Sequence, residues 1–160
     1  MKNFMNDKDF LLSTQTGEKL FHNFAENLPI VDYHCHISPK EIFEDKSFSS
    51  ITEVWLGGDH YKWRLMRANG VDERYITGDA PAREKFQKWA ETLERCIGNP
   101  VYEWSHLELK RFFGYEGNLS GKTAEEVWEL ANKKLASREF SCRNLIRRSN
   151  VRLICTTDDP

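Results

Sequence analysis

The pattern of hydrophobic and polar positions predicts two short strands separated by a long helical stretch. Apolar, partly β-branched residues at about 30–34 and 151–155 are typical of buried strands. Between these runs, apolar residues recur at helical spacing, and glycine or proline closes several segments. Helices are expected at roughly 17–27, 50–56, 60–69, 82–96 and 101–113, and after Thr123 and Ser141. Strands that alternate with helices indicate a parallel α/β sheet.

Polar residues mark the expected starts of three of these helices. Asp59 is placed to cap the helix that starts at His60. Thr123 and Glu126 have the spacing of a capping box, and Ser141 is placed to cap the short helix that follows it. These signals agree with the apolar periodicity, so we expect most of the residues between the two strands to be helical.

Composition and charge narrow the class of protein. The chain has 160 residues, of which 30% are charged and 39% hydrophobic, as in a globular domain. The net charge of −2 and the lack of a basic stripe argue against nucleic acid as a partner. No apolar run approaches the roughly 18–20 residues of a membrane helix. The N-terminus also lacks the apolar core of a secretory signal, so we expect no membrane association and a cytoplasmic protein.

The cysteines support the same location. Cys35, Cys96, Cys142 and Cys155 are widely spaced and form no CxxC pair. We therefore expect free thiols in a reducing compartment and no disulfide framework.

His34 and His36 are the residues with the clearest potential for chemistry. They stand two apart at the end of the first strand, so both imidazoles should point to one face, where they suit Zn²⁺ or a similar ion. Cys35 should point the other way and pack as a small hydrophobic residue. Asp32 should point to the same face of the strand as the two histidines. The alternative is an accidental pair of surface or core histidines.

Longer segments resemble the uronate isomerases (glucuronate isomerases) of the amidohydrolase superfamily. The resemblance lies in 29–36, 58–64, 66–67, 70–71, 77–79, 97–100, 104–109 and 156–160. It implies an α/β fold in which residues 1–160 are the N-terminal part of one distorted (β/α)₈ TIM barrel domain of the metal-dependent hydrolase type. A large helical insertion would occupy about 38–149, between the two strands. A barrel of this class needs about 250 residues or more, so we expect the 160-residue chain alone to be inactive.

The resemblance also implies an activity and a site. The family interconverts D-glucuronate with D-fructuronate, and D-galacturonate with D-tagaturonate, in hexuronate catabolism, and it uses one divalent metal ion, commonly zinc. His34 and His36 match its first-strand metal ligands, and His60 and Tyr61 match substrate-facing positions with catalytic roles. A further ligand, an Asp of the last strand that we take as the base, would lie beyond residue 160. The expected partner is a small-molecule uronate, and whether the protein forms a homo-oligomer stays open.

Arg64 and Asp158 are candidates for binding the substrate. A planar arginine fork suits the sugar carboxylate, but Arg64 and Arg67 are also spaced to form a solvated helix face, which is the favoured interpretation for Arg67. Asp158 and Asp159 point to opposite sides of the chain, so at most one faces a site, and either one suits a turn before the last proline.

Two other functions are compatible with the pattern. A hydrolase of the same superfamily would also carry His-x-His after its first strand. A non-catalytic helical interaction module would instead fold cooperatively without metal, whereas a fragment of a barrel should be unstable or aggregate because its sheet edges are unpaired.

Overall fold

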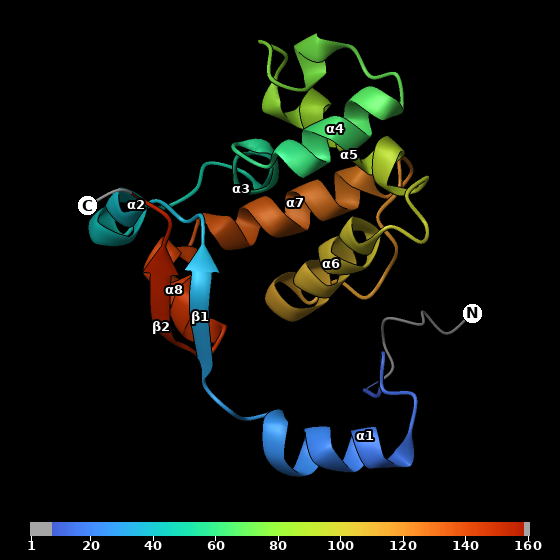
Figure 1. Cartoon of the computed structure of the whole chain (residues 1–160). Helices are drawn as coiled ribbons and strands as arrows, with labels where there is room; N and C mark the ends of the chain where they lie inside the picture. Colours follow the sequence, from blue (N-terminus) through green and yellow to red (C-terminus); the bar gives the residue numbers. More distant parts are fainter. Residues whose placement is uncertain (1–7, 159–160) are drawn as a thin grey trace. The chain divides into compact units, whose positions relative to one another are not determined.

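The computed structural model describes residues 8–158, which form two units (Figure 1). The helical unit comprises residues 48–136. The sheet unit comprises residues 8–47 and 137–158, so the helical unit is inserted between two stretches of the sheet unit.

The sheet unit contains the two predicted strands, β1 (Ile30–Cys35) and β2 (Val151–Thr156). They lie side by side and run parallel (Figure 1), with Ile30 opposite Val151 and Cys35 opposite Thr156. The register shifts twice between these pairs, once after Ile30 and once between Asp32 and Cys35. The prediction of a parallel α/β arrangement is confirmed, because β1 and β2 pair in parallel and helices separate them in the sequence.

Short helices accompany these strands. They are α1 (Gln15–Leu20), the π-helix η2 (Phe21–Ala25), α2 (Pro39–Glu44), the 3₁₀ helix η5 (Arg138–Phe140) and α8 (Cys142–Arg148). Helix α8 packs against both β2 and α2. The expected helix at 17–27 starts earlier, at Gln15, because the Thr14 hydroxyl oxygen accepts the Gly17 N–H at 3.0 Å. Helix α2 was not predicted, since six residues are too few to establish a helical period.

The helical unit is a cluster of helices around α5. Its elements are α3 (Ile51–Leu56), α4 (His60–Ala68), η3 (Glu73–Tyr75), α5 (Ala82–Leu93), α6 (Pro100–Glu108), η4 (Leu109–Phe113) and α7 (Ala124–Leu135). Helix α5 contacts α3, α4, α7 and η3, and Figure 1 shows it beside α7. Its side chains Phe86, Trp89 and Leu93 are completely buried. The predicted helices in this region are therefore confirmed, with ends that differ by at most three residues, and the last turn before Gly114 is a π-helix.

The expected capping box before α7 is wrong. Thr123 occupies the N-cap position, but its hydroxyl donates to the Asn118 carbonyl oxygen at 2.8 Å and accepts the Ser120 N–H at 2.9 Å. The side chain therefore closes the preceding loop instead of capping the helix. Ser141 likewise precedes α8 without a capping bond from its side chain.

Within the sheet unit, the segment that precedes the helical unit is hydrogen-bonded to the segment that follows it. The chain leaves the sheet unit after Ser47, and Arg138 on the returning chain donates to the Ser47 hydroxyl at 3.3 Å. Arg138 also forms an ion pair with Asp45 at 2.9 Å, and the Cys142 N–H donates to the Lys46 carbonyl oxygen at 2.8 Å. The departing and returning segments are thus held side by side.

Two further expectations concern thiols and membranes. Cys35, Cys96, Cys142 and Cys155 are all free, as predicted. Across residues 8–158, every helix is too short or too polar to cross a membrane.

Candidate functional site

The two strand-end histidines face each other. The Nε2 atoms of His34 and His36 lie 3.3 Å apart, and the ring planes are nearly perpendicular at 84°. Both side chains are exposed, whereas Cys35 between them is 8% exposed. The predicted alternation therefore holds at the end of β1, and Cys35 packs inward as expected.

The spacing of these nitrogens fits one metal ion. Two nitrogen ligands at about 2.0–2.1 Å from a tetrahedral zinc ion are about 3.3–3.4 Å apart, which matches the 3.3 Å between His34 and His36. A direct hydrogen bond between the two rings fits the same distance when one Nε2 carries the proton. Within residues 8–158 no cluster of three or more His, Cys, Asp or Glu side chains is suited to hold a metal, so the pair would supply only part of a ligand set.

Thr157 adds a contact to this pair that the sequence did not reveal. Its Oγ1 lies 3.0 Å from the Nδ1 atom of His36. Asp32 is close in the chain, and its carboxylate oxygen accepts the His34 backbone N–H at a long 3.4 Å. Asp158 follows Thr157 and is exposed, whereas Asp159 lies outside the described residues. The candidate site at this edge of the sheet thus combines both strand ends.

His60, Tyr61 and Arg64 form a second group, the His60 cluster, at the start of α4 in the helical unit. The rings of His60 and Tyr61 stack at a centroid distance of 4.5 Å, and the Arg64 guanidinium lies 5.5 Å from the centroid of the Tyr61 ring. Tyr61 is 59% exposed. The structure therefore brings three candidate residues together on one accessible surface, with the phenol and the guanidinium side by side.

A half-buried charge network supports the start of α4. Asp59 caps the helix, as predicted, by accepting the Tyr61 N–H at 2.9 Å, and its other carboxylate oxygen binds the Lys62 ammonium at 2.6 Å. Burial opposes ionisation of Asp59, but Lys62 and the helix N–H donors outweigh it, so the pKa of Asp59 is lowered. Nearby, Glu108 accepts the indole N–H of Trp55 at 2.6 Å, and burial raises the pKa of Glu108. The sequence indicated the cap but not the half-buried network.

Arg67 and His106 have structural partners, and for Arg67 this agrees with the structural interpretation favoured from sequence. The guanidinium of Arg67 binds Glu73, and this hydrogen bond is the largest cause that lowers the pKa of Glu73 to about 2. Buried His106 lies 2.7 Å from the Tyr102 carbonyl oxygen through Nδ1, and its Nε2 accepts the Leu119 N–H at 2.9 Å.

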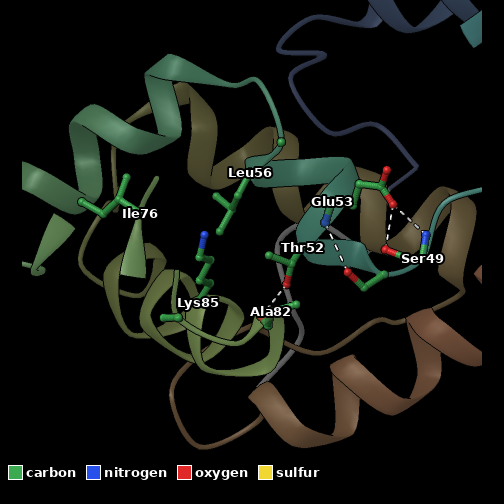
Figure 2. A pocket seen from close by; sticks show the side chains of 10 residues that line it. Ser49, Thr52, Glu53, Leu56, Ile76, Ala82 and Lys85 are labelled. Carbon is green, nitrogen blue, oxygen red and sulfur yellow. Dashed lines mark hydrogen bonds between the residues drawn. The ribbon is translucent and has the colours of Figure 1, made fainter. Parts of the chain in front are cut away.

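A separate hollow of about 220 Å³ lies in the helical unit between α3 and α5 (Figure 2). It is lined by Ser49, Ser50, Thr52, Glu53, Leu56, Gly57, Ile76, Ala80, Ala82 and Lys85. Its polar groups bind within the chain: the Thr52 hydroxyl donates to the Ala82 carbonyl oxygen at 2.7 Å, and Lys85 donates to the Gly78 carbonyl oxygen at 2.6 Å. The predicted site residues lie elsewhere, so we interpret this hollow as a packing feature.

Comparison with known proteins identifies the family. The family model of glucuronate isomerase matches residues 1–160. The chain belongs to the glucuronate isomerase family. It is 71% identical to the uronate isomerase of Lachnospira eligens and 66% identical to that of Lachnoclostridium phytofermentans, in each case over 100% of this chain and 34% of the relative.

A solved structure of the family has the same fold. The crystal structure of uronate isomerase from Thermotoga maritima matches with a TM-score of 0.91 at 44% identity, over 97% of this chain and 34% of that one. The arrangement of helices with a small parallel sheet is thus the one found in a glucuronate isomerase family member. The chain spans about a third of the length of the curated relatives it matches.

Proposed function

We propose that this chain forms the N-terminal portion of a uronate isomerase that interconverts D-glucuronate with D-fructuronate and D-galacturonate with D-tagaturonate. The observation that carries the proposal is the 71% identity to a uronate isomerase across the whole chain. The geometry of the His34–His36 pair and of the His60 cluster is compatible with the chemistry that this reaction needs.

The proposal includes a (β/α)₈ barrel in which β1 and β2 are neighbouring strands. Their parallel pairing and the helix α8 directly before β2 fit that architecture. Active sites of such barrels form at the carboxyl ends of the strands, where His34, His36 and Asp158 lie in this chain.

In this proposal His34 and His36 hold one divalent ion, preferably Zn²⁺, through their Nε2 atoms. The 3.3 Å separation supports shared ligation, and exposure of both rings leaves room for further ligands. When bound, the ion supplies Lewis-acid polarisation of substrate oxygens at the reacting carbons.

The chain's other candidates would bind and orient the open-chain sugar. The reaction moves hydrogen from C2 to C1 and from the C2 oxygen to the C1 oxygen, through an enediol. Tyr61 would donate a hydrogen bond to the carbonyl oxygen as negative charge develops there, with His60 stacked against its ring. Arg64 would pair with the sugar carboxylate, and Asp158 would accept hydrogen bonds from sugar hydroxyls.

The test is an isomerase assay on the full-length product of the gene that encodes this chain. We would supply D-glucuronate or D-galacturonate with Zn²⁺ and follow formation of the ketose. His34→Ala is expected to abolish turnover, and Tyr61→Phe to lower kcat by about 100-fold or more. Both variants should keep the wild-type melting temperature within a few degrees.

Matched controls are available in the chain. His22→Ala removes a histidine in η2 whose ring binds Asp9 and Glu26, and Tyr75→Phe removes a phenol from η3. Both should turn over like wild type. A folded, metal-loaded protein that converts neither uronate would overturn the proposed function and favour a hydrolase of the superfamily.

A further inference from the structure

We propose that Thr157 is a positioning residue for His36, which it holds in the tautomer and orientation that metal binding requires. This inference rests on the proposed function, since it assumes that His36 binds the metal ion. The observation that carries it is the 3.0 Å contact between Thr157 Oγ1 and His36 Nδ1.

The contact follows from how the two strands pair. Cys35 and Thr156 lie opposite each other in the last register pair of the sheet. Side chains alternate along each strand, so the next residues, His36 and Thr157, both turn toward the opposite face from Cys35. The contact thus joins two residues that are 121 positions apart in sequence.

The chemistry of imidazole gives this contact a direction. A neutral histidine that binds metal through Nε2 must carry its proton on Nδ1, and this N–H needs an acceptor. Thr157 Oγ1 is such an acceptor at hydrogen-bond distance. In the other tautomer, the proton would lie on Nε2, which faces the Nε2 atom of His34 at 3.3 Å. By accepting from Nδ1, Thr157 keeps the Nε2 lone pair available for the ion.

His36 needs this support more than His34 does. Strand β1 ends at Cys35, so the backbone of His34 is fixed within the strand whereas His36 lies one residue beyond it. The His36 side chain is also exposed, and therefore little packing restricts its ring. Its orientation then depends on the contact with the His34 ring and on the hydrogen bond to Thr157, one residue beyond β2.

The experiment compares Thr157→Val, Thr157→Ser and Thr156→Val in the full-length gene product. Zn²⁺ affinity is measured by competition with a chromophoric chelator, and Co²⁺ binding by its visible absorption. Loss of an outer hydrogen-bond partner typically weakens metal binding by roughly 10- to 100-fold, which we expect for Thr157→Val. Thr157→Ser keeps the hydroxyl and should restore affinity, and Thr156→Val makes the same change on the opposite face and should leave it unaltered.

The outcomes separate this inference from the proposed function. If His36→Ala abolishes metal binding but Thr157→Val binds Zn²⁺ as tightly as wild type, Thr157 has no positioning role although the proposed function stands. Equal loss of affinity in Thr157→Val and Thr156→Val would also overturn the inference, since it would indicate general damage to the strand. If His36→Ala itself leaves metal affinity unchanged, the proposed metal site fails.

Discussion

At the scale of single residues, His106 is a histidine with a structural role. It is 2% exposed, and both ring nitrogens have backbone partners, the Tyr102 carbonyl oxygen and the Leu119 N–H. Because Nε2 accepts a hydrogen bond, a proton on that atom would break the contact. Burial is the largest cause that lowers the pKa of His106 from 6.5.

We therefore expect His106 to make stability depend on pH. Since its pKa is lower in the folded state, the unfolded chain binds the proton first, and stability is lost as pH falls below about 6.5. His106→Leu leaves the buried Leu119 N–H without an acceptor and should cost about 1–3 kcal/mol at pH 8. Urea denaturation at pH 8 and pH 5.5 should then show a smaller loss for the variant than for wild type.

His22 should affect the pH dependence of stability in the opposite direction. Hydrogen bonds to Asp9 and Glu26 raise the pKa of this half-buried side chain, so its contribution is present at low pH and is lost as pH rises through the raised pKa. If wild type and His106→Leu lost the same unfolding free energy between pH 8 and pH 5.5, the role assigned to His106 would be contradicted.

The candidate site residues that the sequence predicts are those whose signal is local. His34 and His36 were recognisable because a two-residue spacing at a strand end fixes a shared face. Thr157 was not, because its partner is 121 positions away and only strand pairing joins them. The Trp55–Glu108 hydrogen bond was missed for a related reason, since its partners are 53 positions apart. Burial of Lys62 was missed because charged side chains are rarely buried unless they are paired.

At the scale of elements, the start of α4 depends on Asp59. This one carboxylate accepts two backbone N–H groups, from Tyr61 and Lys62, and also binds the Lys62 ammonium, which belongs to a side chain that is largely buried. Replacing it removes a helix cap and an ion-pair partner together.

Asp59→Ala should therefore destabilise the protein by more than the about 1 kcal/mol of an ordinary cap, with about 2–3 kcal/mol as the expected total. Asp59→Asn keeps an acceptor for the helix N–H groups but loses the charge, so its cost should be smaller. Chemical denaturation of the three proteins checks the order, and equal costs for the two variants would mean that the Lys62 ion pair contributes nothing.

Element prediction succeeded where periodicity and caps agreed and failed where short-range alternatives competed. The apolar faces of helices α4, α5 and α7 are long enough for the helical period to be recognised in the sequence. The capping box at Thr123 failed because the same hydroxyl closes the loop from Asn118 instead. Threonine side chains often bind their own loop in this way, and sequence spacing alone cannot distinguish the two uses.

At the scale of the whole molecule, the buried core is unevenly distributed. Within residues 8–158, the buried hydrophobic residues outside the helical unit are Cys35, Phe140 and Cys142. On β1, Val31 is 58% exposed and Tyr33 is 83% exposed. The two units should therefore differ strongly in local stability, because stability against opening follows buried apolar contacts.

Hydrogen exchange of the 160-residue chain should reveal this difference. We expect the slowest amides in α5 and α7, and much faster exchange in β1 and β2, even though strand amides are hydrogen-bonded. Mass spectrometry of peptides from both units measures the protection directly. Similar protection in β1 and α5 would show that the sheet unit is stabilised by more than its visible core.

The overall α/β class and the strand order could be predicted because each strand is a distinct apolar run. The division into two units could not, because it depends on which helices share a core. Helix α8 shows this: its sequence is ordinary for a short amphipathic helix, yet it packs against β2 and α2 and belongs to the sheet unit.

The hydrogen bonds that join Asp45 and Ser47 to Arg138 have a consequence for protein engineering. Because the sheet unit itself closes the gap between departing and returning chain, residues 48–136 can be treated as a removable cassette. A short glycine-rich bridge between Ser47 and Ser137 would span ends that are already adjacent, and closing a short loop costs little entropy. Helical cassettes from related isomerases could be exchanged at the same two junctions while both strands stay unaltered.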